Sequence, residues 1–370
     1  MKYELAESIL KSSMSHLGNS KMTEVITDIQ IISEIKYDDY QQYTHGMRYI
    51  ESLALWMRQF ETDQEKDCAY DFVKKDLVYI SEEEMRQLVM CSYEIAMKRY
   101  LIAKTKAFSN EKNILSVKDR KDVYRYFKRR SLFLGLSDGS HLDFFRRHNS
   151  ELSNEQVCVH YDLSEEKACD MKKELKNEQI VKSINKRYNE NNENFDSFFL
   201  IDDFTGSGRS YIRKDSQGWH GKIYAFYDRF LSKCIGQDDV SVHIVIYVAT
   251  KRALLYIQDQ VDVFSKEKHI NDITVDAIQI VEPVDWNEHS DLKKLLKDNY
   301  KKYFSKVKES YVDKHFKVGG GKEPYLGFGD CSLPLVLYHN TPNNTLPIVW
   351  YSWNNLVDAL FLRVARHKDT

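Results

Sequence analysis

The chain has 370 residues, of which 42% are apolar and 30% are charged. This length and composition favour one large or two modest globular domains and exclude a wholly disordered chain. The net charge of −2 excludes a protein that attracts nucleic acid or anionic membranes through its overall charge.

The six cysteines are scattered and never form a C-x-x-C pair, a spacing that fits neither a zinc ribbon nor a disulfide framework. The N-terminal residues lack an apolar core of signal-peptide length. No stretch approaches the roughly 18 consecutive apolar residues that a membrane helix needs. We therefore expect a cytoplasmic protein without a membrane partner.

Residues 1–115 are expected to form an N-terminal helical region. Leu53 and Phe72 lie in two apolar clusters, and Ser81-Glu82-Glu83-Glu84 has the pattern of a capping box at the start of a helix. A winged-helix module and a simple helical packing domain both fit this region.

Residues 116–285 are expected to form an α/β core, because short apolar runs alternate there with helical periodicity. This order predicts a parallel sheet with crossover helices. The expected strands are Ser131–Leu136, Val157–Tyr161, Phe198–Ile201, Val242–Val248 and Ile273–Val281, and the expected helices are Glu165–Leu175, Lys222–Cys234 and Ala253–Val261. His160 and His243 fall in these strands and are expected to be core residues.

A basic run precedes the first of these strands. Seven Lys or Arg residues and two Asp residues lie between Lys118 and Arg130, with Tyr124, Tyr126 and Phe127 among them. The cations and rings would suit a nucleic acid. A solvated amphipathic helix explains the same pattern, and both interpretations stay open.

Residues 286–370 form a third region. Asp291–Lys314 is expected to be a charged amphipathic helix, and Gly319-Gly320-Gly321 a flexible break. The stretch from Tyr325 to Trp350 is rich in Gly, Pro, Asn and aromatic residues.

The most informative segment is Phe198–Ser210, FFLIDDFTGSGRS. Asp202 and Asp203 follow four apolar strand residues, at the strand end where open α/β sheets bind ligands. The small residues after them allow close backbone approach, and we expect them to lead into a helix whose first N–H groups favour a phosphate. The two carboxylates would accept hydrogen bonds from sugar hydroxyls. Together these features predict a site for a sugar phosphate.

This segment resembles the signature of type I phosphoribosyltransferases. The resemblance implies that Asp202 and Asp203 bind the ribose hydroxyls in catalysis. It also implies that the 5-phosphate is wrapped by Thr205, Gly206, Ser207, Gly208, Arg209 and Ser210. The usual Thr is replaced by Gly206, and a common small residue by Arg209, but neither change removes a phosphate-binding feature.

The same family binds diphosphate at a loop just after the first core strand. Here that position holds Ser137, Asp138, Gly139 and Ser140, between an expected strand and an expected helix. The resemblance implies Mg²⁺ carried by the diphosphate of phosphoribosyl diphosphate, and Asp138 is a candidate to help hold it. An acid at this position would otherwise repel diphosphate and indicate a changed substrate.

The C-terminal region is similar to phosphoribosyltransferase-like proteins with a C-terminal extension, found in bacterial antiphage systems such as type III retrons. The motifs are Trp219-His220-Gly221-Lys222, Gly327–Asp330 and Tyr338–Trp350. In this group a hood over the active site would use His339, Asn340, Asn343 and Asn344. The alternative is a Pro/Asn turn between two strands, LVLY and LPIVW.

The resemblance implies an antiphage effector that transfers or cleaves a ribosyl-phosphate group. Its partners would be a ribose phosphate or nucleotide, and also a reverse transcriptase with its RNA–DNA hybrid and a helix-turn-helix protein. Two alternatives stay open: a catalytically silent nucleotide or ribose-phosphate sensor, and a nucleic-acid-binding subunit that regulates a partner.

Overall fold

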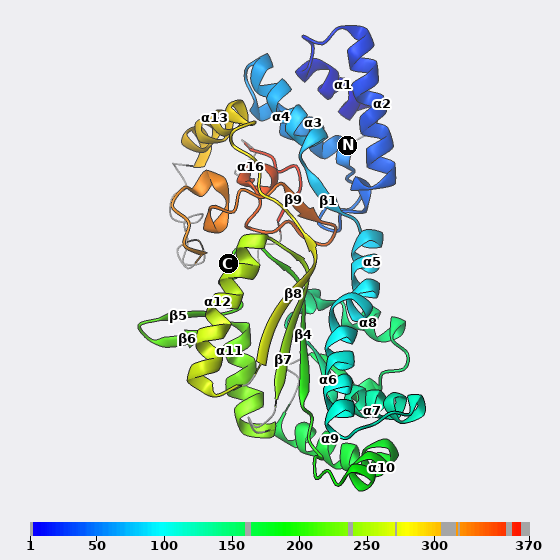
Figure 1. The fold of residues 1–370 in the computed structure, drawn as a ribbon. Helices are drawn as coiled ribbons and strands as arrows, with labels where there is room; N and C mark the ends of the chain where they lie inside the picture. Colours follow the sequence, from blue (N-terminus) through cyan, green and yellow to red (C-terminus); the bar gives the residue numbers. More distant parts are fainter. Residues whose placement is uncertain are drawn as a thin grey trace. The chain divides into compact units, whose positions relative to one another are not determined.

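The computed structural model describes residues 3–159, 164–235, 240–270, 272–304, 316, 319–352 and 357–363. The chain forms two compact units (Figure 1), one made of residues 1–85 and 281–370 and the other of residues 86–280. This division cuts the chain at different places from the three regions expected from the sequence. The reason is a parallel pairing between β1 (Val78–Ile80) and β9 (Leu335–Leu337), which joins the N-terminal helices to the C-terminal residues.

The first unit is mainly helical, as expected for the N-terminal residues. Phe361 stands at the centre of its aromatic core and contacts the rings of Tyr37, Tyr40 and Tyr49 at centroid distances of 5.1 to 5.7 Å. The helix expected over Asp291–Lys314 is described only to residue 304, as α13 followed by a π-helical turn at Tyr300–Phe304. The α-helices are α1 (Tyr3–Ser13), α2 (Asn19–Ile35), α3 (Tyr49–Trp56), α4 (Asp63–Lys75), α13 (Ser290–Asn299) and α16 (Pro347–Trp350).

The capping box predicted at Ser81–Glu84 is present. The Ser81 N–H donates to the Glu84 carboxylate at 2.8 Å, and the Glu84 N–H donates to the Ser81 hydroxyl at 3.2 Å. These bonds satisfy two N–H groups at the start of α5 (Glu82–Ser92). A π-helical turn, Tyr93–Met97, then leads into α6 (Lys98–Glu111).

The second unit contains the predicted α/β core. Its five parallel strands lie in the order β3-β2-β4-β7-β8. They are β2 (Ser131–Gly135), β3 (Val157–Val159), β4 (Ser197–Thr205), β7 (Ser241–Ala249) and β8 (Asp272–Ile280). The helices besides α6 are α7 (Val117–Arg129), α8 (Leu142–His148), α9 (Glu165–Asn177), α10 (Gln179–Tyr188), α11 (Lys222–Phe226) and α12 (Lys251–Lys268). Within the described ranges, no helix is long and apolar enough to cross a bilayer.

Helices cover both faces of this sheet, which explains why its central strands are almost continuously apolar. Successive residues of β4 point to opposite faces. Phe198 packs against Phe226 of α11, with ring centroids 5.7 Å apart, whereas Phe199 stacks on Phe133 and on His243 at 5.0 Å. Figure 1 shows α11 and α12 on one side of the sheet and α6 on the other. His243 is buried, as predicted, whereas His160 lies outside the described residues.

Because all five strands are parallel, the loops that follow β2, β4 and β7 leave the same edge of the sheet. Gly135 at the end of β2 pairs with Ile201 of β4, and Thr205 at the end of β4 pairs with Ala249 of β7. The fold therefore brings the two loops singled out in the sequence to one place.

Candidate functional site

Asp202 and Asp203 lie at the carboxyl end of β4, but their environments differ. The Asp202 side chain has no exposed surface, whereas Asp203 is half-buried. One carboxylate oxygen of Asp202 accepts a hydrogen bond from the Ser137 hydroxyl. The other accepts from the Tyr211 hydroxyl at 2.7 Å and from the Lys222 ammonium group. Asp202 is thus the centre of a network that joins three segments of the chain.

Lys222 and Tyr211 are the residues of this network that the sequence did not single out as functional. Lys222 was noted only within the motif Trp219–Lys222 and the expected helix Lys222–Cys234, and no spacing rule linked Lys222 or Tyr211 to Asp202. Burial raises the pKa of the Asp202 carboxyl, and the Asp203 carboxylate adds to this, whereas the Lys222 ammonium opposes it. Lys222 keeps 29% of its side chain exposed, so a positive charge reaches the surface beside the two carboxylates.

The loop after β2 packs directly against these carboxylates. The Ser140 hydroxyl donates to the Ile201 carbonyl oxygen at 2.8 Å, and the Ser140 carbonyl accepts from the Tyr247 hydroxyl at 2.9 Å. Gly139 lies so close to Asp203 that an added Cβ atom would be 2.5 Å from a carboxylate oxygen. A side chain at position 139 would therefore displace Asp203. Asp138 is exposed at the tip of this loop.

The loop after β4 is held by its carbonyl oxygens, while most of its donors stay available. The Gly206 carbonyl accepts from the Thr250 hydroxyl at 2.8 Å, and the Ser210 carbonyl accepts from the Lys222 N–H at 3.1 Å. The Thr205 hydroxyl accepts from the Gly208 N–H at 3.1 Å. Other donors of this loop have no acceptor in the described part of the chain. They are the amides of Gly206, Ser207, Arg209 and Ser210 and the hydroxyls of Ser207 and Ser210.

Gly208 allows this loop to turn tightly over α12. Its φ of 75° lies in the left-handed region, and an added Cβ atom would be 2.9 Å from the side chains of Tyr256 and Ile257. Arg209, next in the chain, is half-buried and its guanidinium lies 5.4 Å from the Tyr256 ring centroid. The loop is thus fixed on its inner side and offers donors on its outer side, an arrangement that suits an anion.

One expectation about this loop is wrong. We expected the loop to lead directly into a helix, but an antiparallel hairpin of β5 (Arg213–Asp215) and β6 (Gly218–His220) intervenes before α11. The turn residues explain the hairpin, because the Asp215 carboxylate accepts from the Gln217 N–H at 2.8 Å and Gly218 has a φ of 114°. Any donors that this segment offers to an anion are therefore those of the loop itself, because no helix follows it directly.

The four candidate hood residues lie in the first unit. Asn344 is buried, and its amide donates to the Phe328 carbonyl at 2.8 Å; the Asn343 carbonyl accepts from the Phe328 N–H at 2.9 Å. His339 and Asn340 are half-buried, and the Leu337 and Asn340 backbones are hydrogen-bonded to each other across the turn. The segment LPIVW, expected as a strand in the alternative interpretation, is the short helix α16, which begins at Pro347. A role of these residues in binding a base stays a prediction.

The basic run divides into buried and exposed side chains, and Lys128 is half-buried. Arg129 and Arg130 are buried: Arg129 pairs with Glu155 and Glu178 at 2.9 Å, and Arg130 pairs with Asp196 at 3.0 Å. Neither is available to a nucleic acid. The exposed set is Lys118, Arg120, Lys121 and Arg125.

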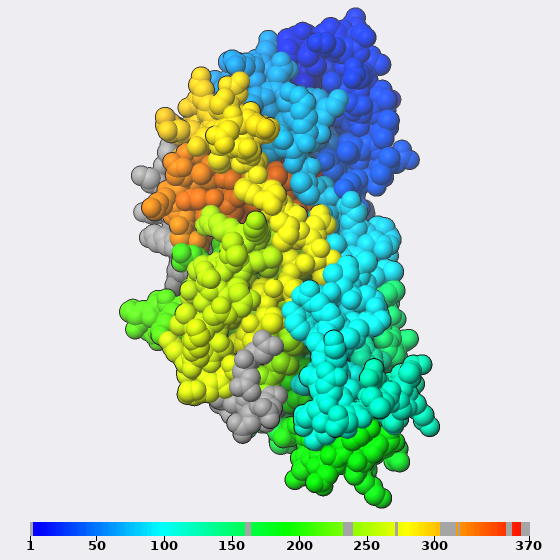
Figure 2. Space-filling view, viewed as in Figure 1, coloured from blue at the N-terminus to red at the C-terminus, as the bar shows by residue number. Residues whose placement is uncertain are grey.

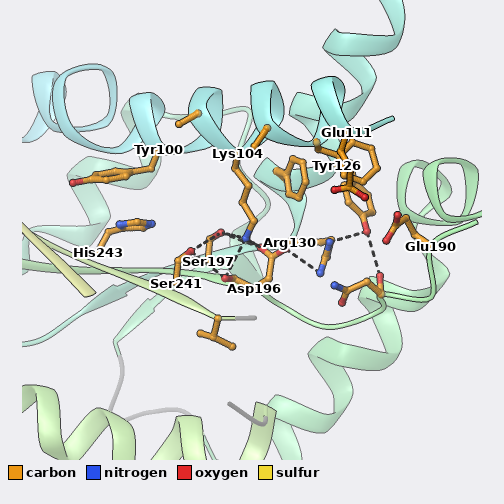
Figure 3. Close-up of a pocket in the computed structure, with 16 residues that line it drawn as sticks. Tyr100, Lys104, Glu111, Tyr126, Arg130, Glu190, Asp196, Ser197, Ser241 and His243 are labelled. Atoms are coloured by element: carbon orange, nitrogen blue, oxygen red, sulfur yellow. Dashed lines mark hydrogen bonds and ion pairs between the residues drawn. The ribbon is translucent and has the colours of Figure 1, made fainter. Parts of the chain in front are cut away.

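A cavity of about 620 Å³ lies at the opposite, amino-terminal edge of the sheet (Figure 3). Lys104 of α6 reaches down to it, donates to the Ser197 hydroxyl at 3.1 Å and pairs with Asp196 at 2.9 Å. Asp196 also pairs with Arg130. Because these charged groups satisfy one another, we assign them a structural role in fastening α6 and the end of α7 to the sheet.

His243, at the same edge of the sheet, should make the stability of the protein sensitive to acid. Burial, with Lys104 and Arg99 nearby, lowers the pKa of His243 from 6.5 to about 3. As the pH falls, His243 is protonated in the unfolded chain at a higher pH than in the folded protein. The free energy of unfolding should therefore fall as the pH drops below 6.5, by about 1 kcal/mol between roughly pH 7.5 and 5.5. Urea unfolding at both pH values measures this loss.

The variant His243→Gln should lose less stability over that range than the wild type, although its hydrogen bond to Thr274 changes. His148→Gln, at an exposed position, is the matched control and should behave as the wild type does. An equal pH dependence of His243→Gln and wild type would contradict the assignment.

Comparison with known proteins adds one finding. The family model PRTase-CE matches residues 53–363, which is most of the chain. No curated protein and no solved structure matches significantly. The matched range includes both loops, the Asp202 network and the candidate hood residues.

Proposed function

The chain belongs to the PRTase-CE family, a group of phosphoribosyltransferase-like proteins, and from this premise we propose that its second unit binds phosphoribosyl diphosphate or a related ribose phosphate. The observation that carries the proposal is the loop after β4. Its amides at Gly206, Ser207, Arg209 and Ser210 share one short turn beside two carboxylates, and no described protein group accepts from them. A 5-phosphate supplies the missing acceptors.

The two aspartates then have different tasks. Asp203 is half-buried and faces the loop after β2, so it is the carboxylate that accepts hydrogen bonds from the ribose hydroxyls. Asp202 is fully buried and already accepts from Ser137, Tyr211 and Lys222. We assign it a positioning role, in which it holds Ser137 and the Lys222 ammonium at the ribose and the leaving group.

The loop after β2 would hold the diphosphate. The Ser137 hydroxyl is fixed by Asp202, and the close approach of Gly139 to Asp203 supports a position of this loop beside the proposed ribose. The donor set fits Mg²⁺, which proteins bind with one or two carboxylates together with substrate phosphates. Asp138 would hold the ion together with the diphosphate. The positive charge of the Mg²⁺ would then offset the negative charge that the leaving group gains.

The proposed reaction transfers the ribosyl group. A nitrogen of the acceptor forms a bond to the ribose C1 while the bond from C1 to the diphosphate oxygen breaks, and diphosphate leaves with the electron pair. The positive charge that develops on the ring requires orientation and electrostatic stabilisation rather than a protein nucleophile. The two loops supply orientation, because one holds the 5-phosphate and the other holds the diphosphate, on either side of Asp203.

The test is a titration with labelled phosphoribosyl diphosphate and Mg²⁺, followed by turnover with a panel of nucleobases and nucleotides. We expect Asp203→Asn to bind at least about 100-fold more weakly than the wild type, since charge-assisted hydrogen bonds to the ribose are lost. Asp170→Asn, an exposed aspartate of the same unit, should bind as the wild type does.

The outcomes separate the possible functions. Turnover that disappears in Asp203→Asn supports the transferase. Saturable binding without turnover by any acceptor would instead support the nucleotide or ribose-phosphate sensor. Absence of binding to any of these ligands would contradict both.

We also propose that the protein acts as an antiphage effector that modifies or depletes a nucleotide-type metabolite. Its proposed partners are a reverse transcriptase with an RNA–DNA hybrid and a helix-turn-helix protein. The resemblance of the C-terminal motifs to effectors of type III retrons supports this proposal. A reverse-transcriptase gene beside the gene of this protein would strengthen it, and a neighbourhood of nucleotide biosynthesis genes would contradict it.

A further inference from the structure

A groove with a volume of about 720 Å³ runs between α6 and α7 on the second unit. Each helix presents one helical stripe to it, and five of the lining side chains are cations: Lys106, Arg120, Lys121, Arg125 and Lys128. No acidic residue is among the lining residues. Burial and the neighbouring Arg125 and Lys98 lower the pKa of Lys128, although Glu151 opposes this, which is in keeping with a surplus of positive charge here.

The groove is also apolar. Ile102 is 51% exposed and Val117 is 70% exposed, although both lie on its walls. The lining carries one aromatic ring, Tyr124, whose hydroxyl is hydrogen-bonded to that of Tyr93 at 3.0 Å. A single-stranded nucleic acid stacks its bases on several aromatic rings, of which this lining has one, whereas aliphatic walls with a cationic rim fit an acidic amphipathic helix.

Helix α2 of the first unit has this character. One face, with Met22, Ile26 and Ile29, is buried in the first unit. The opposite face exposes 53% of Ile31 and 76% of Ile35. Glu24 and Glu34 are exposed with them, and the last turn of the helix contains no basic residue. In Figure 2, α2 (dark blue) and α6 (cyan) are both seen at the surface.

The dimensions of the two surfaces also agree. Helix α2 has 17 residues and α7 has 13, which correspond to lengths of about 25 and 20 Å. A helix with isoleucines at positions 31 and 35 places both on one face, one turn apart. The acidic residues of α2 would then meet the cations on the rim of the groove.

We propose that α2 of one copy of this protein docks in the α6–α7 groove of a second copy. The two surfaces are different patches of the chain, so the contact is heterologous. Each copy offers both a helix and a groove, and the copies therefore assemble head to tail, into a ring or an open chain. This inference does not depend on the proposed function.

The experiment measures mass by light scattering after size exclusion, over a wide range of protein concentration at low salt. The wild type should exceed the monomer mass of 43.7 kDa increasingly as its concentration rises. High salt should reduce the association, because the charges are exposed. The groove variant Lys121→Glu/Arg125→Glu and the helix variant Ile31→Ser/Ile35→Ser should each remain monomeric.

Mixing the two variants distinguishes this interface from any other. The groove variant retains α2, and the helix variant retains the groove, so one contact can form between them and no further copy can add. The mixture should therefore form a 1:1 complex of twice the monomer mass. Arg147→Glu/Lys173→Glu changes the charge equally at positions that are 75% and 74% exposed, and should associate as the wild type does.

Three results would overturn the proposal: a wild type that stays monomeric at every concentration, a mixture of the two variants without a 1:1 complex, or association that both variants retain. Binding of a single-stranded oligonucleotide that Lys121→Glu/Arg125→Glu abolishes, without any self-association of the wild type, would assign the groove to nucleic acid instead. A circular dichroism spectrum and a urea unfolding midpoint like those of the wild type show that each variant is folded.

Discussion

Lys222→Met should lower the free energy of unfolding by about 3 kcal/mol, which is the usual cost of leaving one member of a buried ion pair without its partner. Asp202 has no exposed surface, so water cannot replace the ammonium group that methionine removes. The Lys222 side chain is 29% exposed, which places the effect at the lower end of the range for such pairs. Urea unfolding, followed by circular dichroism, measures the change.

A second substitution tests the cause. Asp202→Asn in the Lys222→Met background removes the uncompensated charge, and the amide still has Ser137 and Tyr211 as hydrogen-bond partners. The double variant should therefore be more stable than Lys222→Met alone. Lys214→Met breaks an exposed pair with Glu267 and should destabilise the protein far less than Lys222→Met does. If the double variant is no more stable than Lys222→Met, the loss of stability in Lys222→Met has another source.

Arg130→Met should destabilise the protein by about 3 kcal/mol as well, because it removes a buried charge and several hydrogen bonds at once. Arg130 is 1% exposed. Its guanidinium pairs with Asp196 and donates to the Asn194 carbonyl at 2.9 Å and to the Tyr126 hydroxyl at 2.7 Å. Lys104 remains beside Asp196, which limits the loss.

Arg125→Met is the control for this prediction. It lies five residues earlier on α7, its side chain is 69% exposed, and its nearest carboxylate oxygen, on Asp122, is 3.9 Å away. It should change the free energy of unfolding by less than about 0.5 kcal/mol. Equal effects of the two substitutions in urea unfolding would contradict the structural role of Arg130.

The sequence predicted the sheet and both loops because their signals are local. Buried parallel strands such as β7 are continuous apolar runs, and the pair Asp202–Asp203 stands at the end of such a run. The spatial neighbours of these residues were not predictable in the same way. The pairing of Lys222 with Asp202 depends on the hairpin between them, and each strand of that hairpin has only three residues.

The basic run shows the same limit. Arg125 and Arg130 are the same residue type in one basic run, and the sequence does not tell which of them is buried. In the structure Arg125 is exposed and Arg130 is buried against Asp196. The partner of Arg130 lies far along the chain at the start of β4. Only the packing of α7 on the sheet decides which cation is free to meet another molecule.

The pairing of β1 with β9 affects how the protein folds. The second unit is one uninterrupted stretch, residues 86–280, so all of it has been synthesised before β9 leaves the ribosome. The first unit must wait for Leu335–Leu337 to pair with Val78–Ile80. Closing so long a loop is slow in an unfolded chain, but a folded second unit shortens the flexible length between the two strands. The unit that carries the two loops would thus fold first during translation and prepare the closure of the other.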